Sequence, residues 1–490
     1  MLIYNSAKRA KEEFQPIDEG KVRMYVCGPT VYDNIHIGNA RTFISFDVIR
    51  RWLIASGYEV TFAQNLTDVD DKIINRANEQ GRAPEDVAEE FSKKFIDVMH
   101  KANVLDPDVR PRATKEIGPM IGMIKSLIEQ GHAYAAENGD VYFAVRSDPS
   151  YGEVSGRKID DLMVGARIEE NEDKCDPLDF ALWKAAKPGE PSWPSPWGEG
   201  RPGWHTECAA MVHRYLGVPI DIHGGGSDLA FPHHENECAQ AACAWHEGFA
   251  NTWMHTGMLL VDGEKMSKSL GNFFTLEEVL EKHSAAALRL LMLQTHYRSP
   301  LDFSWERLEG AENSLTRIAG TVQNLKWAAD HAEGKPDAEL AAGLTSAMER
   351  AAAEYEACMN DDFNTAGAIA AYFQLVTEAN TYLDQAAGAV DPEVARVCGA
   401  VIAGALVQLG VELPEPEEEL PVGLLGVAAG LCAYTGDDVN EAAERILAAR
   451  AEARAAKDWG TADAIRDQLR DMGLMIEDTA AGSRIKYLAS

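Results

Sequence analysis

The sequence has no surplus of basic residues, although it carries many charges. Its 46 Lys and Arg residues stand against 78 Asp and Glu residues, a formal net charge of −32. Proteins that coat nucleic acid rely on clustered basic side chains, so this balance argues against a general nucleic-acid coat protein. A local basic face is still compatible with it, because acidic and basic residues nearly balance from Asn440 to Ser490.

Long apolar runs and a cysteine framework are also absent. No run of eighteen apolar residues occurs, and the start of the chain, Met1 to Lys8, has no apolar signal core. We therefore expect a soluble, cytoplasmic protein with no membrane partner. The eight cysteines are scattered over 490 residues, which argues against a disulfide framework. With 46% hydrophobic residues, the chain can form roughly three or four domains.

Histidine, cysteine and carboxylate side chains gather between Arg201 and Gln240. Pro232 and the alanine-rich run after it predict a helix, because proline is tolerated in a first helical turn. On this helix His233 and Glu237 lie four residues apart on one face, where they could hold one metal ion. Cys208 is a candidate third ligand, and a Cys, His and Glu donor set suits Zn²⁺. Each histidine here could instead be a hydrogen-bonded structural residue.

The first part of the chain supplies a fourth candidate ligand. Apolar alternation from Val22 to Cys27 predicts a strand, and an amphipathic run from Phe43 to Ala55 predicts a helix. Strand, turn and helix form the opening unit of a nucleotide-binding α/β domain, with phosphates bound at the helix N-terminus. Cys27 would lie at the carboxyl end of this strand, where such sheets place their ligands.

Acidic residues follow a second predicted strand that begins at Glu59. Asp68, Asp70 and Asp71 could form a magnesium site, but the favoured interpretation is that they cap a helix starting near Asp70. Helical sequence continues to Asn103. From about 110 to 197 the composition shifts, which indicates an insertion between the two halves of a parallel sheet.

Two lysines lie three residues apart after a further predicted strand, Trp253 to Val261. The segment from Lys265 to Ser269 contains both lysines, two serines and nearby glycines. Such a mobile cationic loop suits a polyphosphate, and the alternative is an ordinary solvated turn. From Leu308 to Leu409 alanine-rich helical periodicity predicts a helical bundle. An acidic, proline-punctuated linker and two further helices, Val439 to Lys457 and Trp459 to Met472, come after it.

Taken together, these segments resemble the class I aminoacyl-tRNA synthetases, and among them the cysteinyl-tRNA synthetases. The nucleotide motif of the class, His-x-Gly-His, corresponds to residues 36–39, and the Lys-Met-Ser-Lys-Ser motif is intact at residues 265–269. The zinc ligands of the family map onto Cys27, Cys208, His233 and Glu237. Asp361-Asp-Phe-Asn-Thr resembles a helical-bundle motif of the family, and residues 454–463 resemble its anticodon-end domain.

The resemblance implies an α/β fold with a Rossmann-type parallel-sheet catalytic domain that carries an insertion, followed by an α-helical bundle and a small C-terminal domain. The expected boundaries are 1–310 for the catalytic domain, including the insertion at about 110–197 and the loop region at about 253–310. The bundle is expected at 311–411, the acidic Pro-rich linker at 412–421 and the anticodon-end domain at 422–490.

The resemblance also implies the reaction. ATP with Mg²⁺ would activate L-cysteine as cysteinyl-adenylate, and the cysteinyl group would pass to the terminal adenosine of cysteine tRNA. His36, Asn39, Lys265 and Lys268 would be catalytic, and Gly38 and Lys268 would bind the nucleotide. One Zn²⁺ per chain would recognise the substrate thiol, and the chain is compatible with a monomer. Asn39 departs from the class pattern, because it replaces a histidine with a side chain that carries no positive charge.

Two further residues, Thr67 and Trp204, would line the amino-acid pocket by resemblance, although either could be a packing residue. The nearest alternative function is a ligase that passes activated cysteine to an amino sugar in thiol biosynthesis. The helical bundle and the near-neutral tail favour tRNA as the acceptor. A zinc hydrolase would have no use for the 265–269 loop, and a non-catalytic tRNA-binding paralogue would not need its lysines.

Overall fold

The computed structural model describes residues 1–159, 173–267, 270–414, 420–479 and 482–487. The chain forms two compact units. The first contains Met1–Glu312, Tyr355–Ile369 and Val407–Val411, and the second contains the remaining segments. Among the described residues, no helix combines the length and the apolar character that crossing a bilayer requires.

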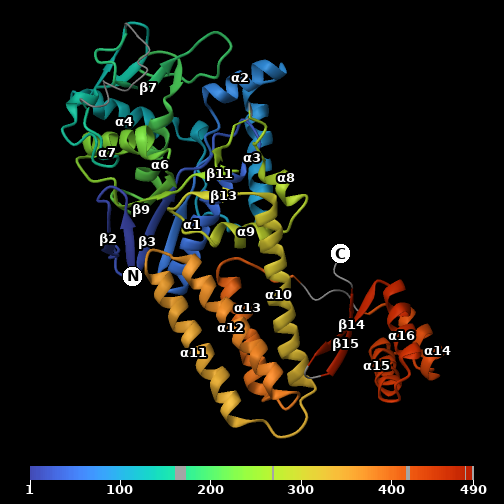
Figure 1. Ribbon diagram of the computed structural model, residues 1–490. Coiled ribbons are helices and arrows are strands. Elements are labelled where there is room, and N and C mark those ends of the chain that lie inside the picture. Colours follow the sequence, from blue (N-terminus) through green and yellow to red (C-terminus); the bar gives the residue numbers. More distant parts are fainter. Residues whose placement is uncertain (160–172, 268–269, 415–419, 480–481, 488–490) are drawn as a thin grey trace. The chain divides into compact units, whose positions relative to one another are not determined.

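A four-stranded parallel sheet forms the centre of the first unit, in the order β10–β9–β3–β4. Figure 1 shows β3 beside β9, although the two strands come from distant parts of the sequence. The bounds are Lys21–Val26 for β3, Glu59–Ala63 for β4, Ile220–Gly226 for β9 and Ala250–Thr256 for β10. The strands predicted from Val22 and Glu59 are confirmed, and their parallel arrangement brings all four carboxyl ends to one edge of the sheet.

Helix α1 (Ile37–Ala55) follows β3 and begins earlier than the predicted start at Phe43. The side chain of His36 accepts a hydrogen bond from the Asn39 backbone N–H, and the Asn39 side chain accepts one from the His36 N–H. These two bonds form a capping box, which satisfies two N–H groups at the start of the helix. The early start was not predicted because histidine is not among the preferred capping residues.

Helices α2 (Asp71–Gln80) and α3 (Pro84–Lys101) follow β4. The Asp70 side chain accepts a hydrogen bond from the Lys72 N–H and caps α2, as the favoured interpretation of the acidic residues predicted. Gly81 ends α2 in the left-handed conformation, with φ at 63°, and Pro84 opens α3. A glycine after a helix and a proline at the start of the next divide the predicted helical stretch in two.

A four-stranded antiparallel sheet, in the order β5–β6–β7–β8, is formed by residues 133–202, so its last strand extends past the predicted end of the insertion at about 197. Phe143 of β6 and Trp183 of β7 are fully buried. The elements of this region are η1 (Ala113–Lys115), α4 (Ile117–Glu129), β5 (Ala133–Ala135), β6 (Val141–Phe143), η2 (Val145–Ser147), β7 (Phe180–Ala185) and β8 (Gly200–Pro202).

Two helices flank β9 in sequence. Helix α6 (Trp204–Tyr215) precedes the strand, and a single π turn, η3 (Ala230–His234), leads into α7 (Glu235–Trp245) after it. Phe231 is extended, with φ at −143° and ψ at 131°, and the helical conformation starts after it. Pro232 therefore lies in a first helical turn, as predicted, while the regular α-helix begins at Glu235.

The single strand predicted from Trp253 to Val261 is wrong. The chain forms β10, which ends at Thr256, and then β11 (Leu259–Val261), which belongs to a second sheet with β12 (Glu264–Lys265) and β13 (Leu301–Phe303). The buried guanidinium of Arg41 donates hydrogen bonds to the carbonyls of Gly257 and Met258 and holds the turn between the strands. Helices α8 (Leu276–Leu280) and α9 (Ala285–Leu293) lie between β12 and β13 in sequence.

The Asp361-Asp-Phe-Asn-Thr segment belongs to the first unit because its second aspartate is a buried hydrogen-bond acceptor there. The Asp362 carboxylate accepts bonds from the Tyr4 N–H (2.8 Å), the Tyr297 hydroxyl (2.8 Å) and Nε of Arg298 (2.7 Å). Asp362 and Phe363 both have positive φ angles, 61° and 52°. Two such residues in succession are strained, and the buried contacts maintain the conformation.

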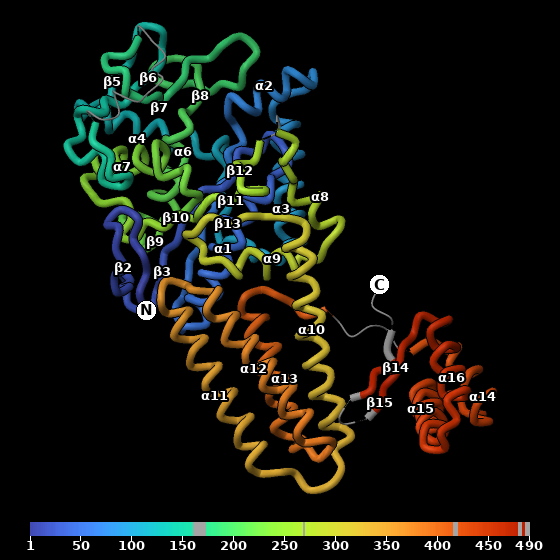
Figure 2. Tube along the Cα trace, viewed as in Figure 1, coloured from blue at the N-terminus to red at the C-terminus, as the bar shows by residue number. Residues whose placement is uncertain are grey.

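Four long helices account for the alanine-rich region, as predicted (Figure 2). Within the second unit, Thr321 bonds Asn380, and the Arg350–Glu378 ion pair joins two neighbouring helices. The helices are α10 (Trp305–Asp330), α11 (Ala338–Asn360), α12 (Thr365–Ala386) and α13 (Pro392–Gln408). Alanine recurs throughout these helices, and it has the highest intrinsic helix propensity.

The last part of the chain has its own small core. Helices α15 (Val439–Ala455) and α16 (Trp459–Asp471) match the two predicted helices. The apolar tail pairs as an antiparallel hairpin, β14 (Leu474–Thr479) with β15 (Gly482–Tyr487). Helix α14 (Gly423–Cys432) contributes Leu424 to the same buried cluster as Ile446, Ile465 and Leu469.

A buried ion pair joins α1 to α9. Arg289 and Asp47 are almost inaccessible to solvent, and Nη2 of Arg289 lies 2.6 Å from Oδ2 of Asp47. The same guanidinium donates to the carbonyls of Ala102, Asn103 and Leu409. Each buried charge therefore has the partners that offset its loss of hydration.

We expect Arg289→Met to lower the free energy of unfolding of the first unit by about 3 kcal/mol, because it leaves buried carbonyls and part of a buried carboxylate unpaired. The matched control is Arg350→Met, whose ion pair with Glu378 is exposed and for which we expect a loss below about 1 kcal/mol. Denaturant unfolding followed by tryptophan fluorescence measures both changes. Equal losses in the two variants would contradict the expectation.

Candidate metal centre and active-site cleft

Cys27 lies directly after β3 at the carboxyl edge of the parallel sheet. Its N–H donates to the Gly224 carbonyl of β9, so the pairing of the strands continues to this residue. Its thiol is buried, and Sγ lies 3.8 Å from Sγ of Cys208 on α6 and 3.5 Å from Oε1 of Glu237 on α7. Three elements thus bring together side chains that are far apart in the sequence.

The four predicted metal ligands are found together. The ligand atoms of Cys27, Cys208, His233 and Glu237 all lie within 4.8 Å of one another, and every one of these residues is buried. Nε2 of His233 lies 2.6 Å from Oε1 of Glu237, as the predicted spacing on one helical face requires. Two thiolates on one tetrahedral Zn²⁺, with bonds of about 2.3 Å, lie about 3.8 Å apart. The Cys27 and Cys208 sulfurs have this separation, and the donor set fits the ion.

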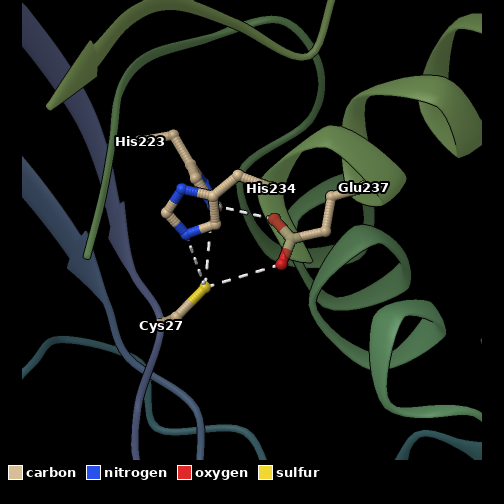
Figure 3. Close-up of side chains that lie close together, drawn as sticks. All are labelled: Cys27, His223, His234 and Glu237. Carbon is tan, nitrogen blue, oxygen red and sulfur yellow. Dashed lines mark hydrogen bonds and ion pairs between the residues drawn. The ribbon is translucent and has the colours of Figure 1, made fainter. Parts of the chain in front are cut away.

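A second set of donors overlaps the first and was not predicted. Cys27, His223, His234 and Glu237 also have ligand atoms within 4.8 Å of one another. Figure 3 shows the two histidine rings and the carboxylate facing the Cys27 thiol. Nε2 of His234 lies 3.4 Å from Sγ of Cys27, and Nε2 of His223 lies 2.8 Å from Oε2 of Glu237. Cys238, by contrast, is in neither set.

The charges of the cluster depend on one another. Burial alone would raise the pKa of Glu237, but the neighbouring His233 and His223 hold it well below its usual range. Burial alone would lower the pKa of His233, but the charge of Glu237 and bonds to Cys208 and Glu237 raise it to about 10. A hydrogen bond from Cys27 lowers the pKa of the Cys208 thiol. These shifts favour an ionised Glu237 and a Cys208 thiolate. Burial raises the pKa of the Cys27 thiol well above its usual value, so a metal ion would have to displace protons from Cys27 and His233.

Two other side chains orient His233. Nδ1 of His205 lies 2.9 Å from Nδ1 of His233, so one ring nitrogen of His233 faces a histidine and the other faces Glu237. Burial, followed by the nearby His233, lowers the pKa of His205 well below its usual value, so His205 is a neutral acceptor. The Trp204 ring stacks on His233 with centroids 4.2 Å apart. These contacts fix the plane of the imidazole.

A cavity of about 300 Å³ opens beside the cluster. Cys27 and Trp204 line it on the metal side, and the start of α1 and the segment after β11 line it elsewhere. The predicted site residues among its lining are Cys27, His36, Gly38, Asn39, Trp204 and Lys265. The predicted nucleotide motif and Cys27, one of the four predicted metal ligands, thus line the same cavity.

Two predicted site residues, Thr67 and Lys268, remain to be considered. Thr67 is not in the lining of this cavity, and its hydroxyl donates to the buried carboxylate of Glu207, 2.7 Å away. Burial raises the pKa of Glu207 well above its usual value. Lys268 is outside the described residues.

The alternative of a magnesium site near Asp70 has no support, because the three carboxylates there have separate partners. Asp70 caps α2, Asp68 accepts two bonds from Thr114, and Asp71 pairs with Lys184 and Arg201. No metal-ligand group of the described residues contains them.

Some residues of the cleft were missed by the sequence analysis. His223 lies in the buried part of β9, opposite Tyr25, and its position near the carboxyl end of the strand was a usable signal, as it was for Cys27. Lys72 lines the cavity with its ammonium 5.5 Å from the centre of the Tyr32 ring. Nothing in the local sequence pointed to Lys72, since its position depends on how α2 meets the cleft.

Comparison with known proteins gives matches over most of the chain. Residues 13–313 match the family described as "tRNA synthetases class I (C) catalytic domain". Residues 354–413 match the DALR domain, and residues 436–485 match the "Cysteinyl-tRNA ligase anticodon binding domain".

Two relatives that match this chain over almost its full length are both named cysteine–tRNA ligase. A cysteine–tRNA ligase of Desulforamulus reducens is 47% identical over 99% of this chain and 99% of its own length. A cysteine–tRNA ligase of Stutzerimonas stutzeri is 48% identical, with coverage of 99% and 98%.

Solved structures of lower identity share the fold. A methionyl-tRNA synthetase of Mycobacterium tuberculosis bound by methionyl-adenylate has a TM-score of 0.62 at 15% identity, covering 81% of this chain and 92% of its own. A leucyl enzyme of Agrobacterium radiobacter has a TM-score of 0.58 at 12% identity, with coverage of 81% and 85%. These likenesses confirm the predicted α/β fold class. The parallel sheet, the matched catalytic domain and the full-length relatives together show that this chain belongs to the cysteine–tRNA ligase family of class I aminoacyl-tRNA synthetases.

Proposed function

We propose that this protein activates L-cysteine with ATP and transfers it to the 3′-terminal adenosine of cysteine tRNA, with one Zn²⁺ ion per chain that recognises the substrate thiol. One observation carries the proposal. The donors Cys27, Cys208, His233 and Glu237 converge beside the cavity that His36, Asn39 and Lys265 also line. A thiol-binding centre and a phosphate-binding surface therefore lie within reach of one small substrate.

In the first step, the cysteine carboxylate attacks the α-phosphorus of ATP, which Mg²⁺ accompanies, and pyrophosphate leaves. We assign His36 and Asn39 to the phosphates, because they form the first turn of α1, where a helix favours anions. Gly38 keeps this approach open, since a Cβ there would lie 2.9 Å from the His36 ring and from Met266. Lys265 and Lys268 would stabilise the charge that develops on the leaving phosphates.

Discrimination between cysteine and serine is the purpose that we assign to the metal. When bound, Zn²⁺ supplies a centre that accepts a thiolate strongly and an alkoxide poorly at neutral pH. Shape alone separates substrates this similar only about a hundredfold. Trp204, which stacks on His233 and lines the cavity, would form a wall of the amino-acid pocket. Thr67 would act on this pocket through its bond to Glu207.

In the second step, a ribose hydroxyl of the terminal adenosine attacks the carbonyl of cysteinyl-adenylate, and AMP leaves. The match of residues 436–485 to an anticodon-binding domain supports tRNA as the acceptor. An amino-sugar acceptor has no anticodon, so the alternative ligase leaves this part of the chain without a function.

Removal of the metal tests the thiol assignment. We expect a chelator-treated protein to lose at least about tenfold of its preference for cysteine over serine in ATP–pyrophosphate exchange, because only shape selection then remains. Cys208→Ser is expected to hold less zinc per chain, measured by elemental analysis. Cys238→Ser is the matched control and should keep its zinc, since Cys238 is in neither donor set. An unchanged preference in the metal-free protein would refute the proposal.

Substitution of the loop lysine tests the activation step. We expect Lys265→Ala to lower kcat for cysteine-dependent ATP–pyrophosphate exchange by roughly 10²-fold, the usual loss when one group that stabilises transition-state charge is removed. The KM for cysteine should change little, because the metal side of the cavity is untouched. Lys187→Ala, at an exposed lysine of the insertion, should behave like the unaltered protein. A kcat that is the same in both variants would exclude Lys265 from this role.

A further inference from the structure

The side chain of Asn272 closes the loop that carries Lys265. Its Oδ1 accepts a hydrogen bond from the Ser267 N–H at 2.8 Å, and its Nδ2 donates to the Lys265 carbonyl at 3.3 Å. The amide thus bonds the backbone on both sides of Met266. Asn272 is half-buried and is not in the lining of the cavity, so it acts on the loop and has no contact with the space where a substrate would lie.

The loop has a second fixed point at its other end. Strands β11 and β12 form a hairpin in which Leu260 pairs with Lys265. At the hairpin turn, the Gly263 N–H donates to Oδ1 of Asp302 at 2.8 Å. Lys265 is therefore the last residue of a strand on one side and a partner of Asn272 on the other. The backbone of Lys265 is therefore bonded on both sides.

The two residues after Asn272 bind the nucleotide motif. The Phe273 ring meets the His36 ring edge-on, with centroids 5.4 Å apart, and Phe273 lines the cavity. The Phe274 carbonyl accepts a hydrogen bond from the N–H of Ile37, the first residue of α1. One short segment, residues 272–274, thus contacts the Lys265 loop at its start and the beginning of α1 at its end.

The loop also contacts α1 directly through Met266. The terminal carbon of Met266 lies where it would be 2.9 Å from a Cβ at Gly38, so the side chain rests against the glycine of the nucleotide motif. Movement of the loop would break this contact. The position of Lys265 relative to His36 and Asn39 consequently depends on the bonds that Asn272 makes.

We propose that Asn272 is a positioning residue that holds the backbone of residues 265–267 near the N-terminus of α1, so that Lys265 is placed to meet the phosphates of the nucleotide. This rests on the proposed role of Lys265 in ATP-dependent activation. If both bonds are lost, Lys265 is still present, but its backbone must be ordered each time cysteine is activated. The loss of conformational entropy then raises the free-energy barrier of activation.

Kinetics of Asn272→Ala in two backgrounds test the inference. We expect kcat for cysteine-dependent ATP–pyrophosphate exchange to fall about tenfold in the otherwise unaltered protein, with little change in the KM for cysteine. In the Lys265→Ala background the same substitution should change kcat by at most about twofold, because a residue that acts through Lys265 has nothing left to position. Equal fold-losses in both backgrounds would overturn the proposal, as would an unchanged kcat for Asn272→Ala.

A second measurement does not depend on activity. Trypsin cleavage after Lys265, followed by mass spectrometry, should be faster in Asn272→Ala than in the unaltered protein, because the freed loop enters the protease more readily. Asn138→Ala is the matched control, since Asn138 also bridges a tight turn by bonds in both directions to Asp140, within the insertion. If cleavage after Lys265 is the same in both proteins, the proposed role of Asn272 is wrong. If the unaltered protein catalyses no cysteine-dependent ATP–pyrophosphate exchange, the proposed function is wrong, and the cleavage experiment still tests Asn272.

Discussion

Parallel pairing of β3 with β9 is the constraint on which the first unit depends. The register sets Tyr25 opposite His223 and Val26 opposite Gly224, and the Cys27 N–H continues the pairing to the Gly224 carbonyl. A Cβ at Gly224 would lie 2.2 Å from the Phe46 ring of α1, so this glycine lets the helix approach the sheet closely. The same pairing therefore places a thiol at the edge of the sheet and the helix with the nucleotide motif beside it.

The electrostatics of the cluster follow from its burial. Isolated charges in such a place would be strongly disfavoured, and the carboxylate of Glu237 is tolerated because it lies between His233 at 2.6 Å and His223 at 2.8 Å. The pKa of His233 is raised to about 10, so a proton on its ring supplies positive charge beside the carboxylate. A divalent cation would supply the same charge at the same place, so one arrangement suits both conditions.

The cavity is lined by positively charged side chains, although the chain as a whole is negatively charged. The net charge is −32, yet Lys72 and Lys265 line the cavity together with the first turn of α1. One carboxylate, that of Asp228, also lines the cavity, whereas Asp70 caps α2 and Asp71 pairs with Lys184 and Arg201. The cavity lining thus has two ammonium groups and one carboxylate, in a chain whose net charge is strongly negative.

Local patterns in the sequence determined several parts of this protein. Apolar alternation located β3, helical spacing set His233 and Glu237 on one face, and an aspartate before a helical run identified the cap of α2. Each is a property of neighbouring residues, whose geometry follows from the period of the backbone. The tertiary structure alone decided the rest. The buried Arg41 separates β10 from β11. The order of the strands brings His223 and His234 into the cluster. The hydrogen bond from Ser267 to Asn272 forms because the loop between them turns back on itself. Packing and side-chain hydrogen bonds bring the residues of these contacts together. A periodic pattern in the sequence does not predict such contacts.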